Sequence, residues 1–228
     1  MVGGIVTRGV ASRTSRPYVT VAISLLCLTS LLVYSGLSPL MQQAMIDLGG
    51  MRPSSLALLS GSALQPPAEG AAFNLVISLF IHASWLHLLG NMAYLWVFGI
   101  KVEQRLGWFG MTLVFLLGGA LANLIVALRL PQLDTPIIGA SGAVSAVVGA
   151  YLGLFPGRHI GLFLPLGLYL QFARVPALLV IGSWFTLQLL YTVFGPMNAA
   201  VAWWTHLAGF AIGLSFALRA RALSQFRL

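Results

Sequence analysis

The sequence predicts an all-α, polytopic membrane protein. Hydrophobic residues make up 59% of the 228 positions and charged residues only 7%, whereas about a quarter of the residues in a soluble domain are charged. So few charges cannot cover the surface of a globule, and lipid must therefore be the solvent for most of the chain. The third observation is a series of six apolar segments, each close to the length of a helix that crosses a bilayer.

The six predicted membrane spans lie at about residues 18–37, 82–100, 109–129, 137–155, 176–194 and 202–220. They belong to one membrane domain over residues 18–221, between a short N-terminal segment at 1–17 and a tail at 222–228. The first apolar run is too long for the core of a signal peptide, and we interpret it as an uncleaved first span.

Two connections differ from the short loops elsewhere. The first loop, at about residues 38–81, mixes glycine and proline with apolar residues and is expected to lie along the membrane interface. Residues 156–175 contain Pro156, Gly161 and Pro165 among apolar residues, and we expect a partly embedded helix there.

The basic residues fix a predicted orientation. With a cytoplasmic N-terminus and six crossings, the outer side receives only Arg52 and Arg129 of the 12 Lys and Arg residues. The inner side receives the rest, which are Arg8, Arg13, Arg16, Lys101, Arg105, Arg158, Arg174, Arg219, Arg221 and Arg227. This split follows the positive-inside rule, so both termini are predicted to be cytoplasmic, in the inner (plasma) membrane of a cell. Because the basic clusters flank spans, the net charge of +8 does not indicate nucleic acid.

Polar groups within a span are costly and indicate a function or a contact. The predicted spans contain His82, His87, Asn91, Asn123, Ser141, Ser145, Ser183, Gln188 and His206. Ser141 and His206 each lie about four residues, or roughly 6 Å, inside the outer ends of their spans. His87 and Asn91 are four residues apart and share one helical face. We expect these four groups to converge near the outer surface. We interpret Asn123, Ser145, Ser183 and Gln188 as interhelical contacts, and His82 as structural or interfacial.

A serine beside a histidine is a minimal nucleophilic pair, because a neutral imidazole can take the hydroxyl proton near neutral pH. The oxyanion that forms then needs hydrogen-bond donors, and the side chains of His87 and Asn91 and the backbone N–H of Ser141 are of the right type. None of the predicted spans contains a carboxylate, so the chemistry must use a dyad. Gly139, Gly142, Gly209 and Gly213 let the fourth and sixth spans pack closely.

Four sequence blocks together resemble the rhomboid family. They are GASG at residues 139–142, HLLGN at 87–91, HLAGFAIG at 206–213 and VEQRLG at 102–107. The resemblance implies a six-transmembrane-helix rhomboid-like bundle, and an intramembrane serine protease that cleaves in or near transmembrane segments of membrane proteins without metal or cofactor.

By the same resemblance, Ser141 is the nucleophile and His206 the general base, and His87 and Asn91 support the oxyanion. The glycines at 139, 142, 209 and 213 set helix contact. Glu103 and Arg105 match a structural motif on the cytoplasmic side.

The chain departs from the family pattern at two places. Many members carry an aromatic residue four positions after the nucleophile, stacked on the catalytic histidine, where this chain has Ser145. Trp203 or Trp204 could support His206 instead. The tryptophan–arginine pair of the first outer loop is also absent, since Arg52 has no adjacent tryptophan.

Other classes of protein fit less well. A zinc site formed by His82, His87 and His206 is disfavoured because His82 and His87 diverge by about 140° on a helix. A transporter is disfavoured because no internal repeat is evident. A non-proteolytic protein of the same fold, which binds and escorts membrane proteins, remains the alternative, although such members typically lack the dyad. The residues determine neither the substrate nor the oligomeric state.

Overall fold

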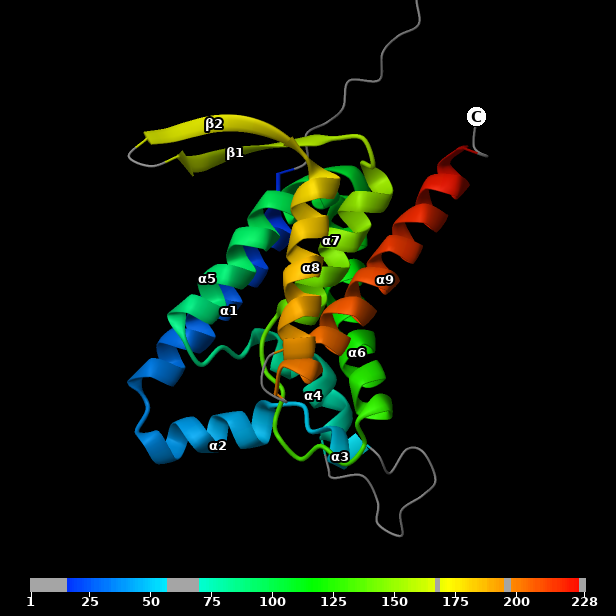
Figure 1. Cartoon of the computed structure of the whole chain (residues 1–228). Coiled ribbons are helices and arrows are strands. Elements are labelled where there is room, and N and C mark those ends of the chain that lie inside the picture. Colours follow the sequence, from blue (N-terminus) through cyan, green and yellow to red (C-terminus); the bar gives the residue numbers. More distant parts are fainter. Residues whose placement is uncertain (1–15, 57–69, 167–168, 195–197, 226–228) are drawn as a thin grey trace, which may run out of the picture.

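The computed structural model describes residues 16–56, 70–166, 169–194 and 198–225. Within these ranges the chain is mostly helical, in agreement with the predicted all-α class, and it also contains one two-stranded antiparallel hairpin. Figure 1 shows the long helices side by side, with the hairpin and the C-terminus at one end and the short helices of the first loop at the other. Of the predicted inner basic residues, Arg8, Arg13 and Arg227 lie outside the described ranges.

The first helix and the loop after it frame the end of the molecule opposite the hairpin. Helix α1 (Tyr18–Gly36) runs along the bundle, and α2 (Pro39–Gly49) lies across its end. Proline at the first position suits α2, because the N–H that proline lacks has no helical partner there. Helix α3 (Pro53–Leu56), helix α4 (Ala71–Ile77) and the 3₁₀ turn η2 (Ser78–Phe80) follow.

A continuous helical run then spans α5 (Trp85–Tyr94), the π-turn η3 (Leu95–Gly99) and α6 (Ile100–Arg129). It turns at Gly107, whose φ of 76° suits only glycine without strain. A Cβ added to Gly99 would lie 3.1 Å from Met111 Cε, although twelve residues of straight helix cover about 18 Å. The run is therefore two helices folded against each other, which agrees with the predicted boundary between the second and third segments.

The start of the second predicted span needs correction. Residues 82–84 precede α5, because Ser84 is extended and its hydroxyl oxygen accepts a hydrogen bond from the backbone N–H of His87. This is an N-cap, the arrangement for which serine is strongly preferred. His82 therefore lies before the helix.

The fourth and sixth predicted spans also begin elsewhere. Helix α7 (Ser141–Leu154) begins at Ser141 itself. The residues before it are not helical, because Ile137 forms a β-bridge with Met51 and Gly139 has a φ of 111°. Helix α8 (Ala177–Phe194) matches the fifth predicted span. Helix α9 (Asn198–Gln225) begins four residues earlier than predicted, so His206 lies two turns inside it.

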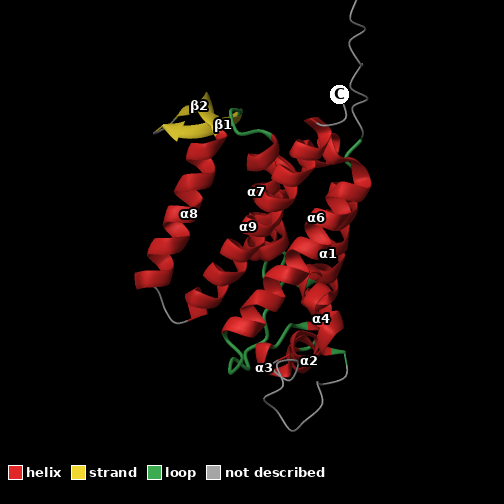
Figure 2. Cartoon of the chain, turned by 90° about the vertical axis from the view of Figure 1, so that its right-hand side faces the viewer, coloured by secondary structure: helices red, strands yellow, loops and turns green. Residues whose placement is uncertain are grey.

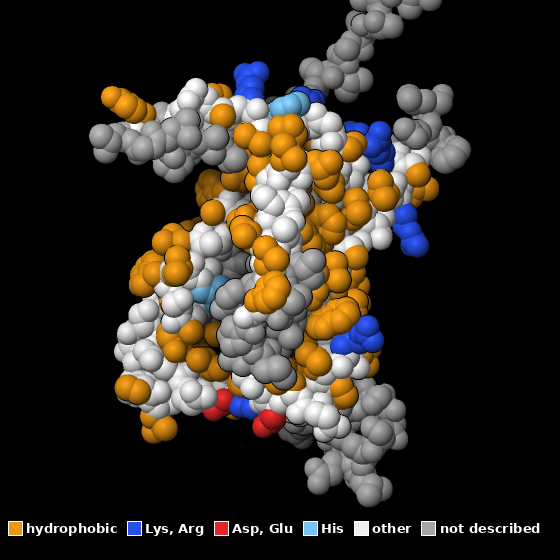
Figure 3. Space-filling model, viewed as in Figure 1, with side chains coloured by type: hydrophobic (Ala, Val, Ile, Leu, Met, Phe, Trp, Pro, Cys, Tyr) orange, Lys and Arg blue, Asp and Glu red, His pale blue; other side chains and the backbone are white. Residues whose placement is uncertain are grey.

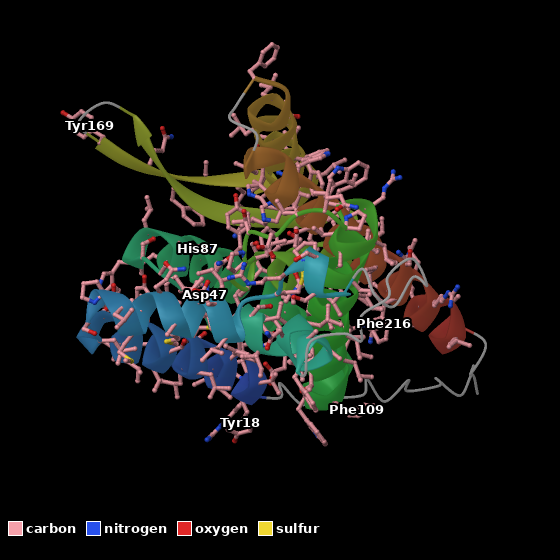
Figure 4. The ribbon with its side chains drawn as sticks, turned by 90° about the horizontal axis from the view of Figure 1, so that it is seen from below. Tyr18, Asp47, His87, Phe109, Tyr169 and Phe216 are labelled. Carbon is pink, nitrogen blue, oxygen red and sulfur yellow. The ribbon has the colours of Figure 1, made fainter. Side chains whose placement is uncertain are left out.

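The expected helix within residues 156–175 is wrong. This stretch forms β1 (His159–Leu166) and β2 (Tyr169–Pro176), with Phe163 opposite Phe172. Proline at 165 would clash inside a helix and has no N–H to donate, which favours the extended form. Figure 4 shows Tyr169 at the free end of the hairpin, well outside the helices.

Small residues hold α7 against α9. A Cβ added to Gly209 would overlap the carbonyl oxygen of Gly142, and one added to Gly213 would overlap that of Ala146. A Cβ on Gly149 would likewise overlap the carbonyl oxygen of Phe210. We call this set of contacts the α7–α9 seam. Gly142, Gly209 and Gly213 all lie in it, since small residues permit close packing between membrane helices.

Length and hydropathy identify two stretches of the described chain that could cross a membrane, Tyr18–Gly36 and the folded run Trp85–Arg129. Shorter apolar helices lie at Ala71–Phe80, Ser141–Leu154 and Ala177–Leu187. Figure 3 shows most of the visible Lys and Arg at the end with the hairpin, and the visible acidic groups at the opposite end. At that opposite end Arg52 pairs with Asp47 at 2.6 Å and lies 3.6 Å from Asp134.

Candidate active site

A cavity of about 960 Å³ opens among α5, α7, α8, α9 and the loop from α6 to α7. His87, Asn91, Ser141 and His206 all line it. These are the four residues that the sequence analysis expected to meet, and they come from three helices distant in sequence. The cavity is otherwise mainly apolar, and Arg129 is its charged lining residue.

Ser141 is the first residue of α7 and is partly exposed. The N–H groups of a first helical turn have no acceptor within the helix, and the helix dipole places partial positive charge there. Two residues earlier, a Cβ on Gly139 would overlap the imidazole of His87. The His87 ring therefore lies directly against the backbone that leads into Ser141, and only glycine leaves room for it.

His206 projects from α9 and is 7% exposed. Within the described part of the chain, neither of its ring nitrogens has a hydrogen-bond partner, so Ser141 Oγ and the imidazole are not hydrogen-bonded here. Their neighbours are in contact, since a Cβ on Gly142 would lie 2.6 Å from Thr205 Cγ2. A Ser141–His206 hydrogen bond thus requires side-chain adjustment. Catalytic hydrogen bonds are often long without substrate and tighten in the complex.

His82 is fully buried and supports Asn91. The Asn91 amide nitrogen lies 3.1 Å from His82 Nε2, and His82 Nδ1 lies 3.3 Å from the Phe80 carbonyl oxygen. A neutral imidazole with its proton on Nδ1 satisfies both contacts, because it then donates to Phe80 and accepts from Asn91. This agrees with the structural role predicted for His82, and it orients the Asn91 side chain at the cavity.

The aromatic ring that lies against His206 is Trp184, which the sequence analysis missed. The two ring centroids are 5.3 Å apart and the planes are tilted by 38°. Trp203 packs on Phe185 instead, and Trp204 contacts the guanidinium of Arg129, so the expectation for those two tryptophans is wrong. A signal was present, because Trp184 lies in the middle of an apolar segment, where anchoring at the membrane interface does not explain a tryptophan.

The remaining polar residues divide into two groups. Asn123 donates hydrogen bonds to the Leu75 carbonyl and to Ser78 Oγ, which confirms an interhelical contact. Ser145 and Ser183 instead donate to carbonyls of their own helices, those of Ser141 and Val180. Serine within a helix commonly bonds back in this way. The expectation of an interhelical contact is wrong for Ser183, which is exposed, whereas Ser145 is also buried against α9, where a Cβ added to Gly209 would lie 3.3 Å from Ser145 Cβ. The side chain of Gln188 lies outside the described residues.

Glu103 performs a structural task far from the cavity. Its fully buried carboxylate accepts hydrogen bonds of 2.8 Å from the backbone N–H groups of Val19 and Thr20, and one of 2.7 Å from the Thr20 hydroxyl. These donors belong to the first turn of α1, where a carboxylate is favoured by both the free N–H groups and the helix dipole. Glu103 thereby joins α6 to α1.

The apolar helices, and a mainly apolar cavity lined by a few polar side chains, define a helical membrane-embedded protein with an internal site. The rhomboid domain profile matches residues 69–222, a stretch that includes all four cavity residues, and the chain belongs to the rhomboid family.

Three relatives illustrate the similarity. Rhomboid protease GlpG of Klebsiella pneumoniae is 31% identical over 155 residues, which are 67% of this chain and 50% of that protein. Rhomboid-like protein 11, chloroplastic, of Arabidopsis thaliana is 43% identical over 74 residues, 32% of this chain and 26% of its own. Putative rhomboid protease YdcA of Bacillus subtilis is 33% identical over 96 residues, which are 41% of this chain and 48% of that protein. The matches thus cover a quarter to a half of these relatives.

Proposed function

We propose that the chain is an intramembrane serine endopeptidase that hydrolyses peptide bonds in or near transmembrane segments of membrane proteins. One observation carries this proposal: a hydroxyl, an imidazole and two further polar side chains, from α5, α7 and α9, line a single cavity. The names of two relatives as rhomboid proteases support it. No metal or cofactor takes part in the proposed reaction.

In the proposed mechanism, His206 takes the proton of Ser141 Oγ as that oxygen attacks the substrate carbonyl carbon. The tetrahedral intermediate collapses when the imidazolium gives this proton to the leaving amine, which departs as the new N-terminus. The acyl group stays on Ser141. His206 then takes a proton from water, which attacks the ester and releases the carboxyl product, and the proton returns to Ser141.

The oxyanion of each intermediate needs donors already in place. The free N–H groups at the start of α7 lie beside Ser141, the Asn91 amide is oriented by His82, and the His87 ring lies over Gly139. The oxyanion would therefore sit between α7 and α5.

The topology that suits this chemistry has six crossings, cytoplasmic termini and a cavity near the outer face of the inner (plasma) membrane. The loop that lines the cavity lies at the end opposite the hairpin and the C-terminus, and it gives water access to a site otherwise enclosed by apolar walls. A substrate segment would enter laterally between α5 and α8. It must partly unwind, because a helix hides its carbonyls in hydrogen bonds.

The unmade Ser141–His206 hydrogen bond is the observation that favours the second candidate, a binding or escort protein without proteolysis. The deciding experiment is labelling of the detergent-purified chain with a fluorophosphonate, together with cleavage of a model transmembrane substrate. We expect labelling at Ser141 and cleavage by the native chain, and neither from Ser141→Ala or His206→Ala variants that still fold. A folded native chain that shows neither reaction would support the escort protein instead.

A further inference from the structure

The imidazole of His206 forms no hydrogen bond with any residue that the structure describes. Both ring nitrogens are buried and unpartnered within the described chain. In a triad, a third group fixes the tautomer and direction of the histidine, but no carboxylate belongs to the described residues that line the cavity. The orientation of this ring must therefore come from packing.

Trp184 supplies that packing. It lines the same cavity from α8, with its ring centroid 5.3 Å from that of His206. Its ring centroid also lies 5.5 Å from that of Tyr94 of α5. The indole thus contacts one ring from α5 and one ring from α9. Tilted aromatic pairs at these separations attract each other beyond the effect of burial alone.

The neighbouring helix does not supply a ring in its place. Ser145 lies one turn after Ser141 on α7, fully buried, and its hydroxyl is bonded to the Ser141 carbonyl. A Cβ added to Gly209 would come within 3.3 Å of Ser145 Cβ, so α7 packs tightly on α9 at this position, and its side chain there carries no ring. The aromatic contact with the His206 imidazole therefore comes from Trp184 of α8.

Helix α8 is buried on one face only. Ala177 and Ile181, four residues apart on that face, are buried, whereas Leu179 and Leu187 are more than 60% exposed. Figure 2 shows α8 at the side of the bundle, beside α7 and α9. The indole of Trp184 therefore joins an outlying helix to the histidine of the site.

We propose that Trp184 is the positioning residue for His206, so that the geometry of the Ser141–His206 pair depends on the placement of α8. This inference rests on the proposed proteolytic function. Trp184 does not touch the reacting atoms and acts through the imidazole. Removal of its ring should lower the rate of the chemical step and leave substrate binding nearly unchanged.

The test compares Trp184→Leu and Trp184→Met with Trp184→Phe, using cleavage of a model transmembrane substrate. We expect kcat to fall about tenfold in both ringless variants with KM within about twofold of native, since an aromatic pair contributes an effect of this size. Trp184→Phe keeps a ring and should stay within about threefold of the native kcat. Trp108→Leu removes a 66% exposed indole elsewhere and serves as the matched control with native kcat.

A second measurement tests the ring contact without relying on activity. In a double-mutant cycle of thermal unfolding, Trp184→Leu should cost less in the His206→Ala background than in the native chain, because the paired ring is already gone. Unchanged kcat in both ringless variants would overturn the proposal, as would additive unfolding effects. If instead the native chain cleaves nothing and takes no label, the proteolytic function itself fails, and with it the role of Trp184.

Discussion

The two sides of the cavity are built differently. The α7–α9 seam brings backbone against backbone at Gly142, Gly149, Gly209 and Gly213, and it carries Ser141 and His206. The facing wall, which we define as Asn91, Tyr94 and Trp184, lines the same cavity, and its Trp184 ring packs against His206 of α9. Close backbone contact leaves no freedom to slide, whereas ring contacts tolerate small shifts. The seam is suited to keep the two reactive residues together, and the wall to orient the His206 imidazole and the Asn91 amide.

The largest effect on the wall should come from Asn91→Ala. Loss of one oxyanion donor lowers kcat by about 10²–10³-fold, and KM should change little because the donor acts in the transition state. Substrate kinetics at saturating concentration measure this. His82→Gln provides the comparison: if His82 acts only by orienting Asn91, its loss should cost less than the loss of Asn91 itself. An Asn91→Ala variant with native kcat would remove α5 from the oxyanion site.

The seam should fail under Gly209→Val. The added methyl groups would meet the Gly142 carbonyl and Ser145, and overpacking of this kind costs about 1–3 kcal/mol. Forced separation of α7 from α9 should also slow labelling of Ser141 by about 10²-fold, because small displacements of reacting groups are costly.

Thermal unfolding and fluorophosphonate labelling measure both effects of Gly209→Val. The matched control is Gly182→Val on α8, where an added Cβ meets nothing within 4 Å. If both substitutions had equal effects, close packing of α7 on α9 would not be what stabilises the fold and keeps Ser141 reactive.

Away from the cavity, Glu103→Gln should destabilise the fold while sparing the chemistry. The amide removes a charged acceptor from three donors of the first turn of α1, two of them in buried hydrogen bonds, at a cost of about 1–3 kcal/mol. The melting temperature in detergent should fall, while kcat measured well below it stays native. Lys101→Gln changes an exposed charge two residues away and should have little effect. A drop in kcat for Glu103→Gln without loss of stability would connect this end to the site.

The smallest expected effect is that of Gly182→Ala. This glycine lies on the exposed side of α8 with open space around it, so alanine should stabilise the helix by up to about 1 kcal/mol. Unfolding measurements should show unchanged or slightly raised stability. Clear destabilisation would mean that the outer face of α8 is packed against something in the membrane.

The sequence alone determined the membrane class, the order of the helical segments and the four residues that meet at the cavity. Hydropathy and spacing are local properties of the chain. Together with the charge bias they predict the depth of each residue in the bilayer, so residues of distant segments can be placed at the same depth. Tertiary structure decided the hairpin at 159–176, the start of α7 at Ser141, the capping of α1 by Glu103 and the contact of Trp184 with His206. These features depend on how the helices tilt, rotate and end. The contact of Trp184 with His206, for example, requires that α8 and α9 each have one particular rotation about the helix axis. No local pattern in the chain specifies that rotation.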